Sequence, residues 1–214
     1  MQKVPFGASP LTVGSAQSSL DIELPIQHIF VDIDGVLADF TASALRVHGR
    51  SEMIDQWPKG ERDIPKVLGI SRSQYWRAIE AEGSDFWREL EPYPWFRELI
   101  DLVQSTAPFS LLTAAPLAPS SVAGKVAWID HHFPKVEGRR FRDFFIGSSK
   151  WLMAAPDRVL IDDAEMLVDR FSEAGGHGIL FPQVWNRDHN AKDPLATVAR
   201  RLAEVASHRD DTAS

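Results

Sequence analysis

The hydrophobic and polar positions of the chain predict five buried strands with helices between them. A short, unbroken apolar run is typical of a strand that is buried on both faces of a parallel sheet. The predicted strands, each centred on apolar residues, are residues 28–33, 108–113, 141–146, 158–161 and 178–181. Strands that alternate with helices predict an α/β fold, with a Rossmann-like parallel sheet and helices on both of its faces.

Residues with strong preferences for helix ends support several of the predicted helices. A helix over residues 40–47 is followed by Gly49, which suits a C-terminal cap. The segment Ser71–Gln74 has the composition of a capping start for a short helix. The pair Asp193-Pro194 is the order expected of an N-cap and a first helical position, so a last helix follows it.

Two further helices flank the second predicted strand. Pro94 opens the first of them at a position of the first turn where proline is permitted. Ser120 opens the second, in which Val122, Val126 and Ile129 recur at i, i+4 and i+7 and predict the inward face.

The segment 43–103 differs in character from the rest of the chain. It holds four of the seven tryptophans, is dense in charge and contains no clear strand. We predict that it is a small, mainly helical cap, inserted after the first strand of a core made of residues 26–42 and 104–207. Residues 1–25 are rich in Ser, Gly, Pro and Gln without a sustained period, which predicts a flexible N-terminal tail.

The bulk composition narrows the classes of function. The 214 residues, 44% of them hydrophobic, suffice for one domain with a modest insertion. A net charge of -7 argues against a nucleic-acid polymer or an anionic membrane surface as partner, because both need basic patches. The absence of cysteine excludes disulfides and cysteine-ligated metals. No apolar run approaches the roughly 20 residues of a membrane span, so we expect a cytoplasmic protein.

Acidic residues follow two of the predicted strands directly. Asp32 and Asp34 come after the first strand, and Asp162 and Asp163 come after the fourth. Because ligands bind at the carboxyl ends of strands in open parallel sheets, we expect these four carboxylates at one edge. Asp and Gly are also common in ordinary strand-to-loop turns, and one acidic pair alone would not decide between the two interpretations. The second pair favours a functional site.

Four converging carboxylates repel one another unless a cation lies among them. Oxygen ligands without His or Cys favour Mg²⁺ over zinc. In such a site Asp32 is the candidate nucleophile toward phosphorus, and Asp34 is the candidate general acid and then base. Lys150 and Mg²⁺ would offset the charge on the phosphoryl oxygens, and Thr113 would donate a hydrogen bond to them.

Several of these residues have simpler interpretations. Lys125, on the helix after the second strand, competes with Lys150 for the role of the site lysine. Thr113 is also an ordinary strand-end hydroxyl. Asp39 is favourable in the first turn of a helix for electrostatic reasons alone. The adjacent pair His131-His132 does not share one helical face, so we interpret it as surface rather than as a metal site.

Four short motifs in order resemble those of the haloacid dehalogenase-like phosphohydrolases. They are Asp32–Val36, the apolar strand ending at Thr113, Lys150, and Ile161–Asp163. The helical insertion lies where that superfamily has its type-1 cap. The resemblance implies a magnesium-dependent phosphotransferase core whose cap closes over the substrate, and it allows a homodimer.

The resemblance also implies a set of metal ligands. These are the Asp32 carboxylate, the Asp34 backbone carbonyl and a carboxylate from Asp162 or Asp163, between which the motif does not choose.

Within that superfamily the chain is most similar to the 5'(3')-deoxyribonucleotidases. The stretches that carry this likeness are Asp34–Phe40, Asp85–Pro92 and Phe181–Asn186. It implies that an aromatic residue of the cap, Phe86 or Trp87, stacks on the base. The other substrate contacts that it implies are Phe40, Thr113, Ala114 and Lys150.

This chain departs from the family pattern in two places. Ser148 stands where members commonly have a basic residue, and Ala114 stands where they have a polar one. Both leave the phosphatase chemistry intact and concern nucleotide specificity.

The sequence therefore predicts a Mg²⁺-dependent phosphatase for a small phosphorylated substrate, with a nucleoside monophosphate as the most specific expectation. One alternative is a phosphatase for a non-nucleotide metabolite such as a sugar phosphate. Another is a catalytically silent relative that binds a phosphorylated ligand. The four acids argue against the silent relative, because a binding module has no need for so much repulsive charge.

Overall fold

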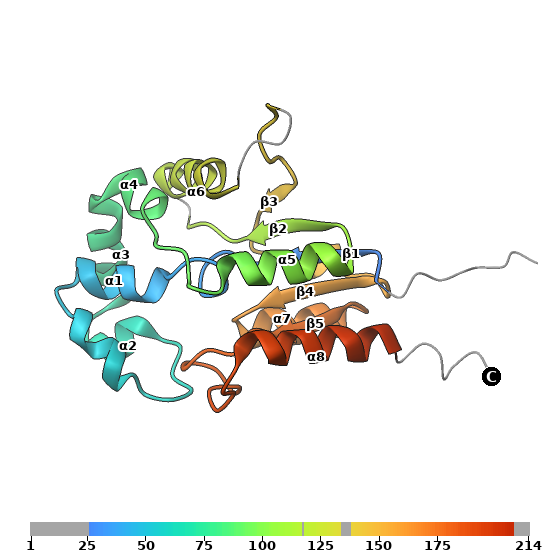
Figure 1. Cartoon of the computed structure of the whole chain (residues 1–214). Coiled ribbons are helices and arrows are strands. Elements are labelled where there is room, and N and C mark those ends of the chain that lie inside the picture. Colours follow the sequence, from blue (N-terminus) through green and yellow to red (C-terminus); the bar gives the residue numbers. More distant parts are fainter. Residues whose placement is uncertain (1–25, 117, 134–137, 208–214) are drawn as a thin grey trace, which may run out of the picture.

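A computed structural model describes residues 26–116, 118–133 and 138–207 (Figure 1). Its centre is a five-stranded sheet in which every pair of neighbouring strands is parallel, in the order β3-β2-β1-β4-β5. The strands are β1 (His28–Val31), β2 (Phe109–Thr113), β3 (Phe144–Ile146), β4 (Arg158–Asp162) and β5 (His177–Leu180). The predicted fold class is confirmed, and the strands differ from the predicted runs only at their ends.

Helices cover both faces of the sheet, because successive strand side chains point to opposite sides. Ile29 and Val31 of β1 belong to the main hydrophobic core, whereas Phe30 belongs to a second cluster on the other face. Helices α5 (Phe96–Thr106) and α8 (Pro194–Ser207) pack on the first face, and α7 (Glu165–Glu173) and the short helix η2 (Lys150–Met153) on the second (Figure 1). Within the described ranges, no helix is both long and apolar enough to cross a membrane.

The segment between β1 and α5 is helical and lies at the carboxyl ends of the strands (Figure 1). It contains α1 (Phe40–Val47), the 3-10 helix η1 (Ser51–Gln56), α2 (Ile64–Leu68), α3 (Arg72–Ala81) and α4 (Gly83–Arg88). The capping start predicted at Ser71 is a full capping box with Gln74. The cap bounds 43–103 stay a prediction, because Leu99 and Val103 of α5 share one hydrophobic cluster with residues of both the insertion and the sheet. Pro94 precedes the N-cap of α5, Trp95, rather than lying in its first turn.

Of the three residues predicted to face the core from helix α6 (Pro119–His132), only Ile129 is buried there. Val122 and Val126 are 41% and 39% exposed, whereas Lys125 and Trp128 are buried. The reason is the contact of α6 with α4, at which a Cβ on Gly124 would lie 2.5 Å from the Cβ of Trp87. This close approach turns the valines outward and directs Lys125 inward. The apolar period was therefore a misleading signal here.

Candidate active site

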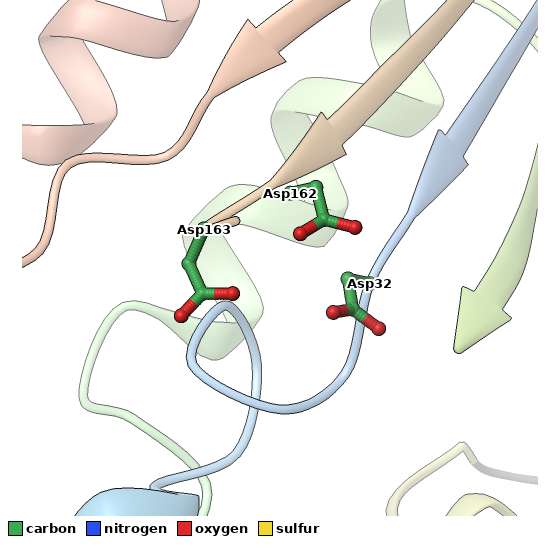
Figure 2. Close-up of side chains that lie close together, drawn as sticks. All are labelled: Asp32, Asp162 and Asp163. Carbon is green, nitrogen blue, oxygen red and sulfur yellow. The ribbon is translucent and has the colours of Figure 1, made fainter. Parts of the chain in front are cut away.

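The loops after β1 and β4 bring three carboxylates together. Asp32, Asp162 and Asp163 are buried, and one oxygen from each lies within 4.8 Å of the others. Figure 2 shows Asp32 just beyond the end of β1 and the other two at the end of β4. The register of the sheet produces this convergence, because β1 and β4 are parallel neighbours with Val31 opposite Ile161.

Lys150 offsets part of this negative charge. Its Nζ lies 2.9 Å from Asp32 Oδ1 and 2.6 Å from Asp162 Oδ2, and its side chain is only 1% exposed. Burial raises the pKa of Asp162 to about 7, against the opposing effect of Lys150. Even with Arg62, whose Nη1 lies 3.1 Å from Asp163 Oδ2, two positive charges face three buried carboxylates, which leaves room for a further cation.

The two carboxylate oxygens of Asp163 differ, because one has hydrogen-bond and ion-pair partners and the other has none among the described residues. Its Oδ2 accepts a hydrogen bond from Trp185 Nε1 at 2.6 Å and lies 3.1 Å from Arg62 Nη1. Its Oδ1 is buried and has no hydrogen-bond partner within the described part of the chain. Both oxygens of Asp162, in contrast, accept hydrogen bonds, from Lys150 and from the backbone N–H of Ala164. A buried carboxylate oxygen without a donor fits a metal ligand, so the residues present suit Mg²⁺.

Asp34 lies apart from this cluster. The alternation of a continued strand would have placed Asp32 and Asp34 on one side, but β1 ends at Val31. Asp34 Oδ2 instead accepts from Lys125 Nζ at 2.6 Å, and the same ammonium donates to Thr113 Oγ1 at 3.2 Å. Lys125 and Lys150 are therefore not alternatives, because each belongs to a separate acid–base group of the site.

The Asp34 carboxyl is suited to holding a proton. Burial raises its pKa, with Lys125 opposing and the neighbouring charge of Asp32 adding to the rise. Its Oδ1 has no hydrogen-bond partner among the residues that the structure describes. A carboxyl with a raised pKa and a free oxygen can donate a proton to a bound group and take one back.

The absence of a side chain at Gly35 allows the acidic loop to approach Asp163 closely. It has a φ of +78°, and a Cβ at this position would lie 2.7 Å from Asp163 Cγ and closer still to Oδ2. We expect Gly35→Ala to lower the free energy of unfolding by roughly 2–4 kcal/mol, since backbone strain and a displaced carboxylate act together. Urea unfolding followed by tryptophan fluorescence measures the loss.

Gly49→Ala is the matched control for that change. Gly49 has a φ of +64° and nothing within 4 Å of its added Cβ, so it carries the backbone strain without the clash. Its loss of stability should be about 1 kcal/mol. Equal losses in the free energy of unfolding for the two variants would show that the Asp163 side chain can move away from the added Cβ without destabilising the protein. Gly35 would then have no role in positioning Asp163.

A cavity of about 890 Å³ opens beside Asp34 and Asp163. Its walls are rich in aromatic side chains, with Arg62 and several carboxylates among them. The aromatic lining residues are Phe40, Trp57, Tyr75, Trp76, Trp87 and Trp185.

The cavity includes some of the predicted substrate contacts and not others. Phe40, Trp87 and Ala114 line it. Phe86 does not. It lies behind this wall with its ring edge-on to Phe40, at a centroid distance of 5.7 Å. Of the two candidates for stacking on a base, the geometry therefore supports Trp87 over Phe86. Thr113 and Lys150 are fully buried and do not line the cavity.

Two residues of the site could not be given a role from the sequence. Arg62 is one of many charged residues in the insertion, and only the fold shows that it reaches Asp163. Trp185 lies in the stretch Phe181–Asn186 that carries the family likeness, and only the fold shows that its indole N–H donates to the same carboxylate. Both lie far from Asp163 along the chain, so no local spacing could connect them to it.

Comparison with protein families gave one match. The sequence model of the family described as 5' nucleotidase, deoxy (pyrimidine), cytosolic type C protein (NT5C) matches residues 25–196. None of the curated proteins matches the chain. The matched range contains all four acids and both buried lysines.

Solved structures share the fold at low sequence identity. A haloacid dehalogenase-like family hydrolase from Streptococcus pneumoniae is 16% identical, with a TM-score of 0.52 over 82% of this chain and 98% of that one. A haloacid dehalogenase-like family hydrolase from Xanthomonas campestris is 15% identical, with a TM-score of 0.51 over 85% and 94%. These likenesses show the fold, in agreement with the sheet order and the inserted helices.

Proposed function

The chain belongs to the cytosolic type C family of 5' (deoxy)nucleotidases and is a phosphoric monoester hydrolase, and on that premise we propose that it hydrolyses nucleoside monophosphates with Mg²⁺. The observation that carries the proposal is the buried cluster of Asp32, Asp162 and Asp163. Asp163 has a buried oxygen without a hydrogen-bond partner among the described residues, and it also lines the aromatic-rich cavity. The family's description also favours the cytoplasm as its compartment.

The proposed Mg²⁺ ligands are Asp32 and Asp163, together with the backbone carbonyl of Asp34 that the family resemblance implies. Asp163 is preferred to Asp162 because its Oδ1 is unpartnered, whereas both oxygens of Asp162 already accept hydrogen bonds. Arg62 and Trp185 hold Asp163 Oδ2 and so direct Oδ1 toward the cluster. When bound, the ion supplies positive charge next to the phosphoryl oxygens.

In the proposed reaction, an Asp32 carboxylate oxygen attacks phosphorus while the bond from phosphorus to the ester oxygen breaks. Asp34 donates its proton to that oxygen, so the alcohol leaves neutral and Asp32 carries the phosphoryl group. Asp34, now ionised, takes a proton from water as the water attacks phosphorus. Inorganic phosphate leaves and Asp32 is regenerated as a carboxylate.

The two lysines have different tasks in this scheme. Lys125 is 2.6 Å from Asp34 and stabilises the anion that forms when Asp34 gives up its proton. Lys150 lies between Asp32 and Asp162 and offsets the negative charge of both carboxylates.

The cavity favours a flat leaving group with a single phosphate. Phe40 and Trp87 stack at a centroid distance of 5.5 Å and present aromatic surface beside the acids. The lining contains five carboxylates and two arginines, so its net negative charge would disfavour a second phosphate. A nucleoside monophosphate meets both conditions.

A substrate panel tests the proposal. With Mg²⁺ present, we expect kcat/KM for the best nucleoside 5'-monophosphate to exceed that for sugar phosphates by roughly tenfold or more, since stacking on aromatic walls adds binding energy. Phosphate release from ribo- and deoxyribonucleotides, hexose phosphates and glycerol phosphate provides the measurement. Removal of the metal with EDTA should abolish all hydrolysis, and Mg²⁺ should restore it.

Two outcomes would contradict this proposal separately. A preference for sugar phosphates would contradict the proposal of a nucleotide substrate but not the phosphatase activity. Full activity in EDTA would contradict the proposed requirement for Mg²⁺.

A further inference from the structure

The hydroxyl of Tyr75 is buried and has no hydrogen-bond partner in residues 26–116, 118–133 and 138–207. Tyr75 belongs to α3 and is 2% exposed, and its ring is part of the cavity wall. Buried hydroxyls almost always have a partner, because leaving one unpaired forfeits the hydrogen bonds that water made to it. The unpaired hydroxyl therefore suggests that a ligand bound in the cavity supplies its hydrogen-bond partner.

Neighbouring rings hold Tyr75 in place. It stacks on His48 with centroids 5.1 Å apart and an interplanar angle of 13°, and it meets Trp76 nearly edge-on at 5.0 Å. His48 Nε2 is also unpartnered, but stacked rings cannot direct their polar atoms at each other, so the two groups do not satisfy one another. The tyrosine hydroxyl thus has a set position before any ligand binds.

A row of aromatic side chains connects this hydroxyl to the reacting end of the site. Lys125 Nζ, which contacts Asp34, lies 4.9 Å from the centroid of the Trp87 ring. Trp87 stacks on Phe40, and Phe40 contacts Trp76 at 6.4 Å. Trp76 then contacts Tyr75. A substrate whose phosphate lies at Asp32 would extend its leaving group along this wall toward Tyr75.

The phenol is suited to donate a hydrogen bond. Burial raises its pKa, and the charges of Asp34 and Asp63 raise it further. It therefore remains protonated at neutral pH.

We propose that Tyr75 is a specificity-determining residue, whose hydroxyl donates a hydrogen bond to an acceptor atom of the leaving group. The acceptor would be a base carbonyl, a ring nitrogen or a sugar oxygen. The site would then select leaving groups that carry such an atom over purely hydrocarbon ones, because the latter leave the hydroxyl unpaired. The assignment rests on the proposed phosphatase function and on the phosphate lying at Asp32.

Tyr75→Phe tests this with two substrates. One is the best nucleoside monophosphate of the panel. The other is phenyl phosphate, whose leaving group has no hydrogen-bonding atom beyond the ester oxygen. We expect kcat/KM to fall roughly tenfold for the nucleotide and to stay unchanged for phenyl phosphate. The melting temperature should stay the same or rise, because the variant lacks an unpaired polar group.

The matched control is Tyr93→Phe, at the only other tyrosine of the chain. The Tyr93 hydroxyl has a partner, Asp39 Oδ1 at 3.2 Å, and does not line the cavity. This variant should leave the ratio of the two substrates unchanged.

Two results for Tyr75→Phe would overturn the inference. An equal loss of kcat/KM on both substrates would indicate a structural role for the hydroxyl. No loss of kcat/KM on either substrate would indicate that water is its hydrogen-bond partner. If the wild-type protein hydrolyses phenyl phosphate but no nucleotide, only the proposal of a nucleotide substrate fails. The effect of Tyr75→Phe on phenyl phosphate is then compared with its effect on the best sugar phosphate.

Discussion

Asp32→Asn is expected to reduce phosphatase activity by on the order of 10³-fold or more while the protein stays folded. An amide is a far weaker nucleophile toward phosphorus than a carboxylate, and it also weakens a proposed metal ligand. The fold should tolerate the change because Asn is nearly isosteric with Asp. Removing one of three clustered negative charges also relieves repulsion within the cluster.

The measurement is the release of phosphate from the best substrate at saturating Mg²⁺, with circular dichroism to confirm the fold. Asp39→Asn is the matched control, at a position four residues after Gly35. Asp39 Oδ1 caps α1 by accepting from Ala42 N at 2.9 Å, a task that asparagine also performs. This control should keep its activity within a few-fold of wild type. Undiminished activity in Asp32→Asn would rule out Asp32 as the nucleophile.

Lys150→Met is expected to lower the free energy of unfolding by about 3–5 kcal/mol in metal-free protein. Lys150 is the ammonium shared by Asp32 and Asp162, which are only 6% and 0% exposed. Methionine matches the length of the lysine stem but leaves both buried carboxylates without their cation. Added Mg²⁺ should recover part of the loss, because it replaces positive charge at the same place.

Lys125→Met is the comparison for this prediction. Lys125 pairs with Asp34, whose side chain is 25% exposed and so keeps part of its hydration. Its loss should therefore cost less stability than that of Lys150, while activity falls in both variants. Urea unfolding in EDTA, repeated in Mg²⁺, measures both variants. Equal losses of stability would contradict the separation of the site into two charge groups.

Local patterns in the sequence were sufficient for most of the fold. The apolar runs located all five strands, since a strand buried on both faces must be apolar throughout. The capping box at Ser71 and the N-cap at Asp193 were readable because capping depends on side chains within a few residues. The face of α6 was not readable, because contact with α4 rather than the apolar period decides it.

The same division applies to the site. Asp32, Asp162 and Asp163 could be placed at one edge from the sequence, because parallel strands bring their carboxyl ends together. The partners of these acids could not be placed. Asp34 turns away to Lys125, and Asp163 is held by Arg62 and Trp185, through contacts between residues distant in the chain. Such contacts depend on how the cap, α6 and the loop after β5 pack on the sheet, and no local spacing encodes that packing.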